Sequence, residues 1–162
     1  MKFLAPVVLL LGVVVYQSLF SELFSIAEIK PDLALALTAY LALVRGPEAG
    51  LAFGFFSGLC LDVLSPLSLG TGMFIRALIG YLVGNFKDHL FLDTLSAKGT
   101  VVALASLVAG LFQAFWTSGP RVGHVLWFLW RYGFLIALYT GLLGIFIFAV
   151  AEGKVRLKPK TT

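Results

Sequence analysis

The residues of this sequence that could do chemistry are four charged side chains inside or beside long apolar runs. Asp32 opens one run, and Asp62 lies near the end of the next. Arg76 and Arg131 lie within two later runs. A charge inside a membrane costs at least about 2.5 kcal/mol unless it is paired or hydrated. Two charges of each sign therefore predict a compensated polar network. Such a network either ties helix ends together, the interpretation that we favour, or lines a pocket for a ligand or partner.

The sequence offers little for catalysis or metal binding. His89 and His124 fall in loops expected on opposite sides of a membrane, so they cannot share a metal. Ser57 is flanked by glycines in a way similar to the nucleophile motif of intramembrane serine proteases, but the spacing is one residue too long. No histidine lies inside another apolar run to act as its base, so Ser57 is interpreted as a small packing residue. The lone Cys60 excludes a disulfide or a CxxC site within the chain. We expect no catalytic residue, metal or cofactor.

The strongest internal pattern is steric, because glycines recur at every fourth position of one apolar run and two more follow in the next. Residues four apart share one face of a helix. Stripes of this kind let two helices in a membrane approach closely. The stripe either packs inside the bundle or receives the transmembrane helix of a partner, and we expect it to organise such a docking surface. The glycines concerned are Gly50, Gly54, Gly58, Gly80 and Gly84.

Composition determines the elements that must position these residues. The chain has 162 residues, of which 60% are apolar and 12% charged, whereas a soluble domain carries about 25% charged residues. Its mean hydropathy is +1.00. Six spans of about 20 residues would use roughly 120 positions and leave no room for a soluble catalytic domain. We predict an all-α polytopic membrane protein with six transmembrane helices in one bundle, forming a single domain over residues 1–162.

Charged residues, glycines and prolines divide the chain into six apolar spans. The second is short, because its fourteen apolar residues from Pro31 to Val44 reach about 21 Å across a hydrocarbon core of about 30 Å. It must begin earlier, near residue 26, or be tilted, thinned or sheltered by its neighbours. The sixth is overlong, which indicates a tilted or projecting helix. The predicted spans are 3–20, 26–44, 49–64, 67–86, 99–117 and 125–151.

The basic residues predict the orientation of the chain. Six spans place both termini on one side, and loops on the cytoplasmic side carry an excess of Lys and Arg. Cytoplasmic termini would put Lys2, Arg45, Lys87, Lys98, Lys154, Arg156, Lys158 and Lys160 inside, and only Lys30 and Arg121 outside. The formal charge of +4 is therefore attributed to topology. The basic tail is interpreted as an anchor at anionic headgroups of the lipid bilayer, and no nucleic-acid partner is expected.

Several motifs between residues 30 and 84 then resemble one family in their order and spacing. The motifs are Lys30-Pro31-Asp32 before an apolar helix, Arg45-Gly46-Pro47, the glycine stripe that ends at Asp62, Ser65-Pro66-Leu67-Ser68-Leu69-Gly70, and Gly80-Tyr81-Leu82-Val83-Gly84. Together they resemble the rod shape-determining protein MreD. The rest of the chain adds a similar length, six spans, internal termini and a basic tail.

The resemblance implies a non-enzymatic scaffold in the bacterial inner membrane. MreD proteins bind MreC, which has one span and a large external domain, within the Rod complex that elongates the cell wall. That complex also involves the RodA polymerase, its penicillin-binding protein and MreB filaments. The family's fold is held to resemble the six-helix substrate-binding subunit of energy-coupling-factor transporters.

Two competing functions were weighed against the scaffold. A vitamin-binding subunit of an energy-coupling-factor transporter usually carries an Ala-x-x-x-Ala-type motif near the start of its first span. The corresponding segment here, from Phe3 to Leu9, has no clear match. An intramembrane enzyme is the weakest alternative, because Ser57 lacks a base.

Overall fold

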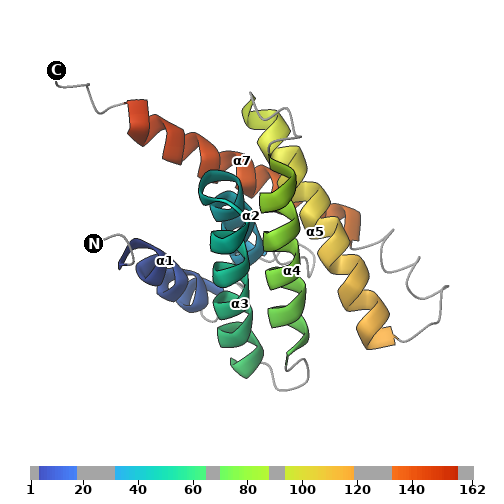
Figure 1. The fold of residues 1–162 in the computed structure, drawn as a ribbon. Coiled ribbons are helices and arrows are strands. Elements are labelled where there is room, and N and C mark those ends of the chain that lie inside the picture. The colour runs from blue at the N-terminus through green and yellow to red at the C-terminus, as the bar shows by residue number, and fades with distance from the viewer. Residues whose placement is uncertain (1–3, 18–31, 65–69, 88–93, 119–132, 157–162) are drawn as a thin grey trace.

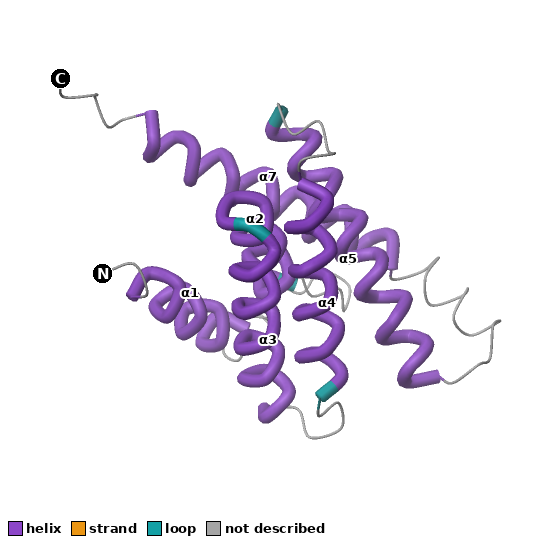
Figure 2. The backbone as a smooth tube through the Cα atoms, viewed as in Figure 1, coloured by secondary structure: helices purple, strands orange, loops and turns teal. Residues whose placement is uncertain are grey.

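A computed structural model describes residues 4–17, 32–64, 70–87, 94–118 and 133–156 of the chain. Figure 2 draws these residues almost entirely as helix, and the described ranges contain no strand. The six helices are α1 (Leu4–Val15), α2 (Leu33–Arg45), α3 (Pro47–Leu64), α4 (Thr71–Phe86), α5 (Leu95–Ser118) and α7 (Phe134–Arg156), as Figure 1 labels them. The predicted all-α class is confirmed, and one helix falls in each predicted span.

Three of these helices are long and apolar enough to cross a membrane. They are α3, the part of α5 over Leu95–Trp116, and the part of α7 over Phe134–Ala151. Helix α7 continues to Arg156 and is strongly inclined to α3 and α4 in Figure 1. The predicted span 125–151 begins outside the described residues, so an overlong helix that is tilted or projecting stays a prediction.

Helix α2 is the short span, and its neighbours shelter it. Its 13 residues reach about 20 Å. It contacts each of the other five described helices, and Ala34, Ala36, Ala39 and Ala42 are fully buried. Because protein surrounds the helix, it does not have to match the thickness of the lipid. The earlier start near residue 26 is wrong, since Asp32 has non-helical φ −89° and ψ 86° and caps a helix that begins at Leu33.

Two other helices begin at residues that differ from the predicted ones, and in both the reason is local. Helix α4 begins at Thr71 and not at residue 67, because Gly70 stands before it in a left-handed conformation with φ 89°. Helix α5 begins at Leu95, earlier than residue 99. The side chain of Thr94 accepts a hydrogen bond from the N–H of Ala97 and so caps this earlier start.

The directions of the helices give the bundle two distinct ends. Helices α3 and α4 are antiparallel, since Gly58 meets Met73 near one end and Gly84 meets Pro47 near the other. Helix α2 is joined to α3 through Gly46 alone. The end where α2 and α4 begin carries Asp32 and Asp62 and is called the acidic end.

The opposite end is called the basic end and is defined by Arg45, Lys87 and Lys98. Helices α2 and α4 finish there and α3 begins there. Helix α5 also begins there, because it is antiparallel to α7, and α7 runs parallel to α2 with Phe148 against Tyr40. Lys98, in the first turns of α5, lies over the Phe148 ring at 5.5 Å.

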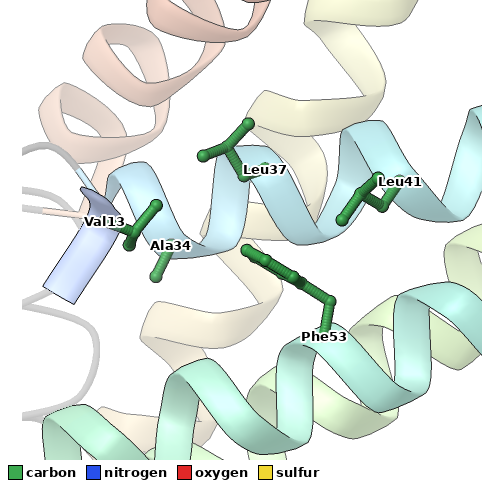
Figure 3. Packing of buried hydrophobic residues seen from close by; sticks show 5 residues of the cluster. All are labelled: Val13, Ala34, Leu37, Leu41 and Phe53. Atoms are coloured by element: carbon green, nitrogen blue, oxygen red, sulfur yellow. The ribbon is translucent and has the colours of Figure 1, made fainter. Parts of the chain in front are cut away.

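The core around α2 joins the first three helices. Figure 3 shows Phe53 reaching from α3 toward α2, with Ala34, Leu37 and Leu41 on the α2 side and Val13 arriving from α1. Since Val13 is near the end of α1 and Ala34 near the start of α2, α1 ends toward the acidic end. The start of α1 and the end of α7 thus lie toward the same end of the bundle.

Candidate functional site

The glycines of α3 place the backbones of α3 and α4 in direct contact. A Cβ atom added to Gly50 would lie 2.5 Å from the carbonyl oxygen of Gly80 and 2.6 Å from Cβ of Ala42. A Cβ added to Gly54 would lie 2.7 Å from the carbonyl carbon of Arg76. Both distances are far below ordinary contact, so any side chain on these glycines would push the helices apart.

The same contact continues to both ends of the helix pair. A Cβ on Gly58 would lie 2.7 Å from the backbone nitrogen of Met73, and one on Gly84 would lie 2.5 Å from that of Pro47. The whole stripe is therefore covered by α4, with α2 closing over the middle of it.

This packing corrects the docking hypothesis for the glycine face itself. A partner's helix could reach Gly50, Gly54 or Gly58 only if α4 moved away. The packing alternative describes what these glycines do in the chain, and we no longer expect a partner on this face. Binding of a partner elsewhere on the bundle stays a prediction.

A second glycine contact joins α5 to α7. A Cβ on Gly141 would lie 2.8 Å from Cβ of Ala103, and one on Gly144 would lie 3.0 Å from the Val102 side chain. Gly99 meets Ile145 at the basic end of the same contact. The bundle thus consists of two tightly packed helix pairs, α3–α4 and α5–α7, both in contact with α2.

Arg76 and Asp32 form an ion pair at the start of α2. Nη2 of Arg76 donates to Oδ2 of Asp32 at 2.9 Å, and the two side chains are only 14% and 23% exposed. Oδ1 of Asp32 accepts the N–H of Leu35 at 2.9 Å and so caps α2. The N–H of Asp32 points to Oγ1 of Thr140 on α7 at 3.4 Å. One aspartate therefore links α2, α4 and α7.

Asp62 joins the same region from α3. It is 4% exposed, and its Oδ2 accepts the N–H of Met73 at 3.0 Å, in the first turn of α4. Its Oδ1 and Nη1 of Arg76 both lie against Gly72, where a Cβ would lie 2.6 Å from that nitrogen. We call Asp32, Asp62 and Arg76, with their neighbour Gly72, the charge cluster.

The structure thus brings together three of the four charged residues that the sequence singled out. The direct ion pair seen for Arg76 is with Asp32, whereas Asp62 lies beside it and caps α4. Arg131 falls outside the described residues. The sequence analysis missed Thr140, a fully buried hydroxyl inside an apolar run, and Gly72, which stands one turn before Arg76. The i, i+4 spacing of Gly72 and Arg76 is the signal that could have found Gly72.

The positions of Ser57 and of the charge cluster give little support to catalysis or metal binding. Ser57 is fully buried and its hydroxyl donates to the carbonyl oxygen of Gly54 at 3.3 Å, as a packing residue would. Within the described ranges, no three His, Cys, Asp or Glu side chains are grouped as metal ligands. Both oxygens of Asp32 are engaged by Leu35 and Arg76. The charge cluster therefore acts as a tie between helices.

The family model of the rod shape-determining protein MreD matches residues 1–148. The chain belongs to the MreD family. Searches among curated proteins and among solved structures gave no significant match. The family match covers five of the described helices entirely and most of α7, well beyond the motifs of residues 30–84 that suggested it.

Membership in the MreD family gives the chain a role in rod shape determination. The apolar helices agree with a membrane location for this MreD protein. The family is one of structural membrane proteins that determine cell shape, and the buried, engaged positions of Ser57 and Asp32 agree with a structural part for them. Most of the motif residues that resembled MreD lie on α2, α3 and α4, the helices that form the glycine contact and the charge cluster.

Proposed function

We propose that this MreD protein is a non-enzymatic scaffold of the bacterial cell-elongation complex, which holds the single transmembrane helix of an MreC-like partner. Through that partner it would regulate peptidoglycan synthesis by the RodA polymerase and its penicillin-binding protein. The complex also involves MreB filaments. The match to the MreD family over residues 1–148 carries this proposal. No comparison supports the alternative of a vitamin transporter subunit.

The way the polar residues are used supports a scaffold. The carboxylates of Asp32 and Asp62 cap helices and surround one guanidinium. Glycine contacts fix the two helix pairs at backbone distance. A bundle built in this way is rigid, and a rigid bundle offers a defined outer surface to a partner helix.

The partner helix must use an outward face, since α4 covers the glycine stripe. Every described helix has exposed apolar side chains that could touch lipid or a partner. A matched set tests five of the six described helices, because its members are 54–64% exposed: Leu11 on α1, Phe56 on α3, Phe74 on α4, Phe115 on α5 and Leu142 on α7.

The experiment places a photo-crosslinking amino acid at each of these five positions in cells that contain the MreC-like partner. We expect strong crosslinks to the partner's helix from one helix or from two neighbouring helices, and weak ones from the others. The buried Ser57 is no site for a probe, so Phe56 next to it tests whether the outer side of α3 is used. If wild-type protein does not retain the partner on purification, and no position crosslinks to it, the scaffold proposal is wrong.

Orientation and fold resemblance belong to the same proposal. We place both termini in the cytoplasm of the inner membrane, because Arg45, Lys87 and Lys98 all lie at the end toward which α1 begins and α7 finishes. We also keep the resemblance to the substrate-binding subunit of energy-coupling-factor transporters as a prediction. A helix-by-helix superposition of an experimental structure on such a subunit tests it.

A further inference from the structure

Two cations meet at the turn between α2 and α3. Arg45 is the last residue of α2 and is exposed to the surroundings. Gly46 makes the turn with φ 101°, a conformation that suits glycine. Lys87 arrives from the end of α4, and its Nζ lies 3.8 Å from where a Cβ on Gly46 would stand. The ammonium group therefore lies over the turn, one residue away from Arg45.

Neither cation is neutralised inside the described part of the chain. Among those residues, neither Arg45 nor Lys87 forms an ion pair, although Glu48 stands on the first turn of α3. Two other described basic residues are occupied, since Arg76 pairs with Asp32 and Lys98 lies over the Phe148 ring. The α2–α3 turn thus holds two cations that form no ion pair within the described residues.

The turn also stands at one end of a helix that is long enough to cross the hydrocarbon core. It directly precedes α3, whose 18 residues are apolar enough to cross a membrane and reach about 27 Å, close to the thickness of the hydrocarbon core. An α3 that crosses the core would therefore hold its first residues at headgroup level. The positive end of the α3 dipole adds to the two cations there.

We propose that the α2–α3 turn binds the phosphate of an anionic phospholipid, with Arg45 and Lys87 as its two cations. The lipid is identified by its chemistry, because its acyl chains can lie along the exposed apolar side chains of α3, such as Leu51 and Phe55, while the phosphate meets the turn. The site does not depend on binding of a protein partner.

The test measures phosphatidylglycerol bound to the full-length protein in nanodiscs, by native mass spectrometry and by the shift of the unfolding temperature relative to phosphatidylcholine alone. The site variant is Arg45→Gln with Lys87→Gln. The control is Lys30→Gln with Arg121→Gln, which removes the same charge from the loops predicted on the opposite side of the membrane. At about fivefold per cation, the site variant should bind phosphatidylglycerol about 25-fold more weakly. The control should stay near the wild-type value.

Several results would overturn the proposal. Equal weakening in the site variant and the loop control would mean diffuse attraction to a charged surface. Stabilisation of the protein by inorganic phosphate in phosphatidylcholine nanodiscs, equal to that by phosphatidylglycerol, would mean a site for soluble anions. If the double variant does not fold, Lys87→Arg and Lys87→Gln replace it. The first should keep the lipid and the second should lose it, and equal binding by the two contradicts the proposal.

Discussion

Replacing Gly54 by alanine tests the central contact of the bundle. The added Cβ would lie 2.7 Å from the carbonyl carbon of Arg76 and 2.9 Å from the nitrogen of Ala77. Both atoms belong to the backbone of α4, so no side chain can turn away to make room. Raising the 2.7 Å distance to an ordinary contact of about 3.4 Å requires α3 and α4 to separate by at least about 0.7 Å, because the carbonyl oxygen of Arg76 would lie closer still.

The cost follows from that displacement. Overpacking of a well-packed contact costs about 1–3 kcal/mol, and the higher helix propensity of alanine returns less than about 1 kcal/mol. Gly54→Ala should therefore lose about 1–2 kcal/mol of stability, and Gly54→Leu considerably more. The charge cluster should loosen as well, because Arg76 is itself the residue whose backbone is pushed.

The matched control is Gly110→Ala on α5, where nothing lies within 4 Å of the added Cβ. It makes the same chemical change in another helix of the bundle and should leave stability unchanged or slightly raised. Thermal unfolding in detergent, followed by size-exclusion fluorescence, measures both variants beside the wild type. A Gly54→Ala protein as stable as Gly110→Ala would refute the close approach of α3 and α4. For Gly54→Leu, expression, stability and partner binding should fall together, whereas selective loss of the partner from a stable protein would restore the docking hypothesis.

Three further predictions concern charges and topology. Arg76→Gln leaves the partly buried carboxylate of Asp32 without its cation and should cost up to about 3 kcal/mol in thermal unfolding. Adding Asp32→Asn, which keeps the cap of α2, should recover much of that loss, and a double variant no better than the single one would mean that the pair is not coupled. Gly72→Ala places a methyl group against the guanidinium and should destabilise by about 1–3 kcal/mol, a result that an unchanged unfolding temperature contradicts. Thr162→Cys in a Cys60→Ala background should resist a membrane-impermeant thiol reagent in intact cells, and labelling there would reverse the proposed topology.

The glycine pattern shows how far the sequence could lead. Four-residue spacing in α3 and the pair Gly80 and Gly84 predicted a face of close approach, and the structure has backbone contact on that face. The identity of the covering helix could not be predicted. A stripe of glycines lacks side chains that would select a partner, so α4 and a foreign helix are equally compatible with the pattern of Gly50, Gly54 and Gly58.

The charges show which part of the site the sequence could not place. The predicted span that begins at residue 67 puts Arg76 nine residues into its helix. The helix begins at Thr71, so Arg76 stands only five residues in, about 7.5 Å from the start of α4. The left-handed Gly70 decides this boundary, and a glycine before an apolar run does not reveal its φ in the sequence.

The short α2 explains why Asp32 and Arg76 can meet at all. In the antiparallel connection through Gly46, α2 has 13 residues against the 18 of α3, so its first turn stops about 7.5 Å short of the far end of α3. A helix that ended this far inside the hydrocarbon core would be strongly destabilised if lipid surrounded it, because its unpaired N–H groups would face hydrocarbon. Asp32 satisfies one of them and Arg76 neutralises Asp32, while the surrounding helices exclude lipid. The short α2 is therefore stable inside the bundle because its alanines are buried and an ion pair stabilises its first turn. Changing the length of α2 should disrupt the ion pair before it disrupts the glycine contacts.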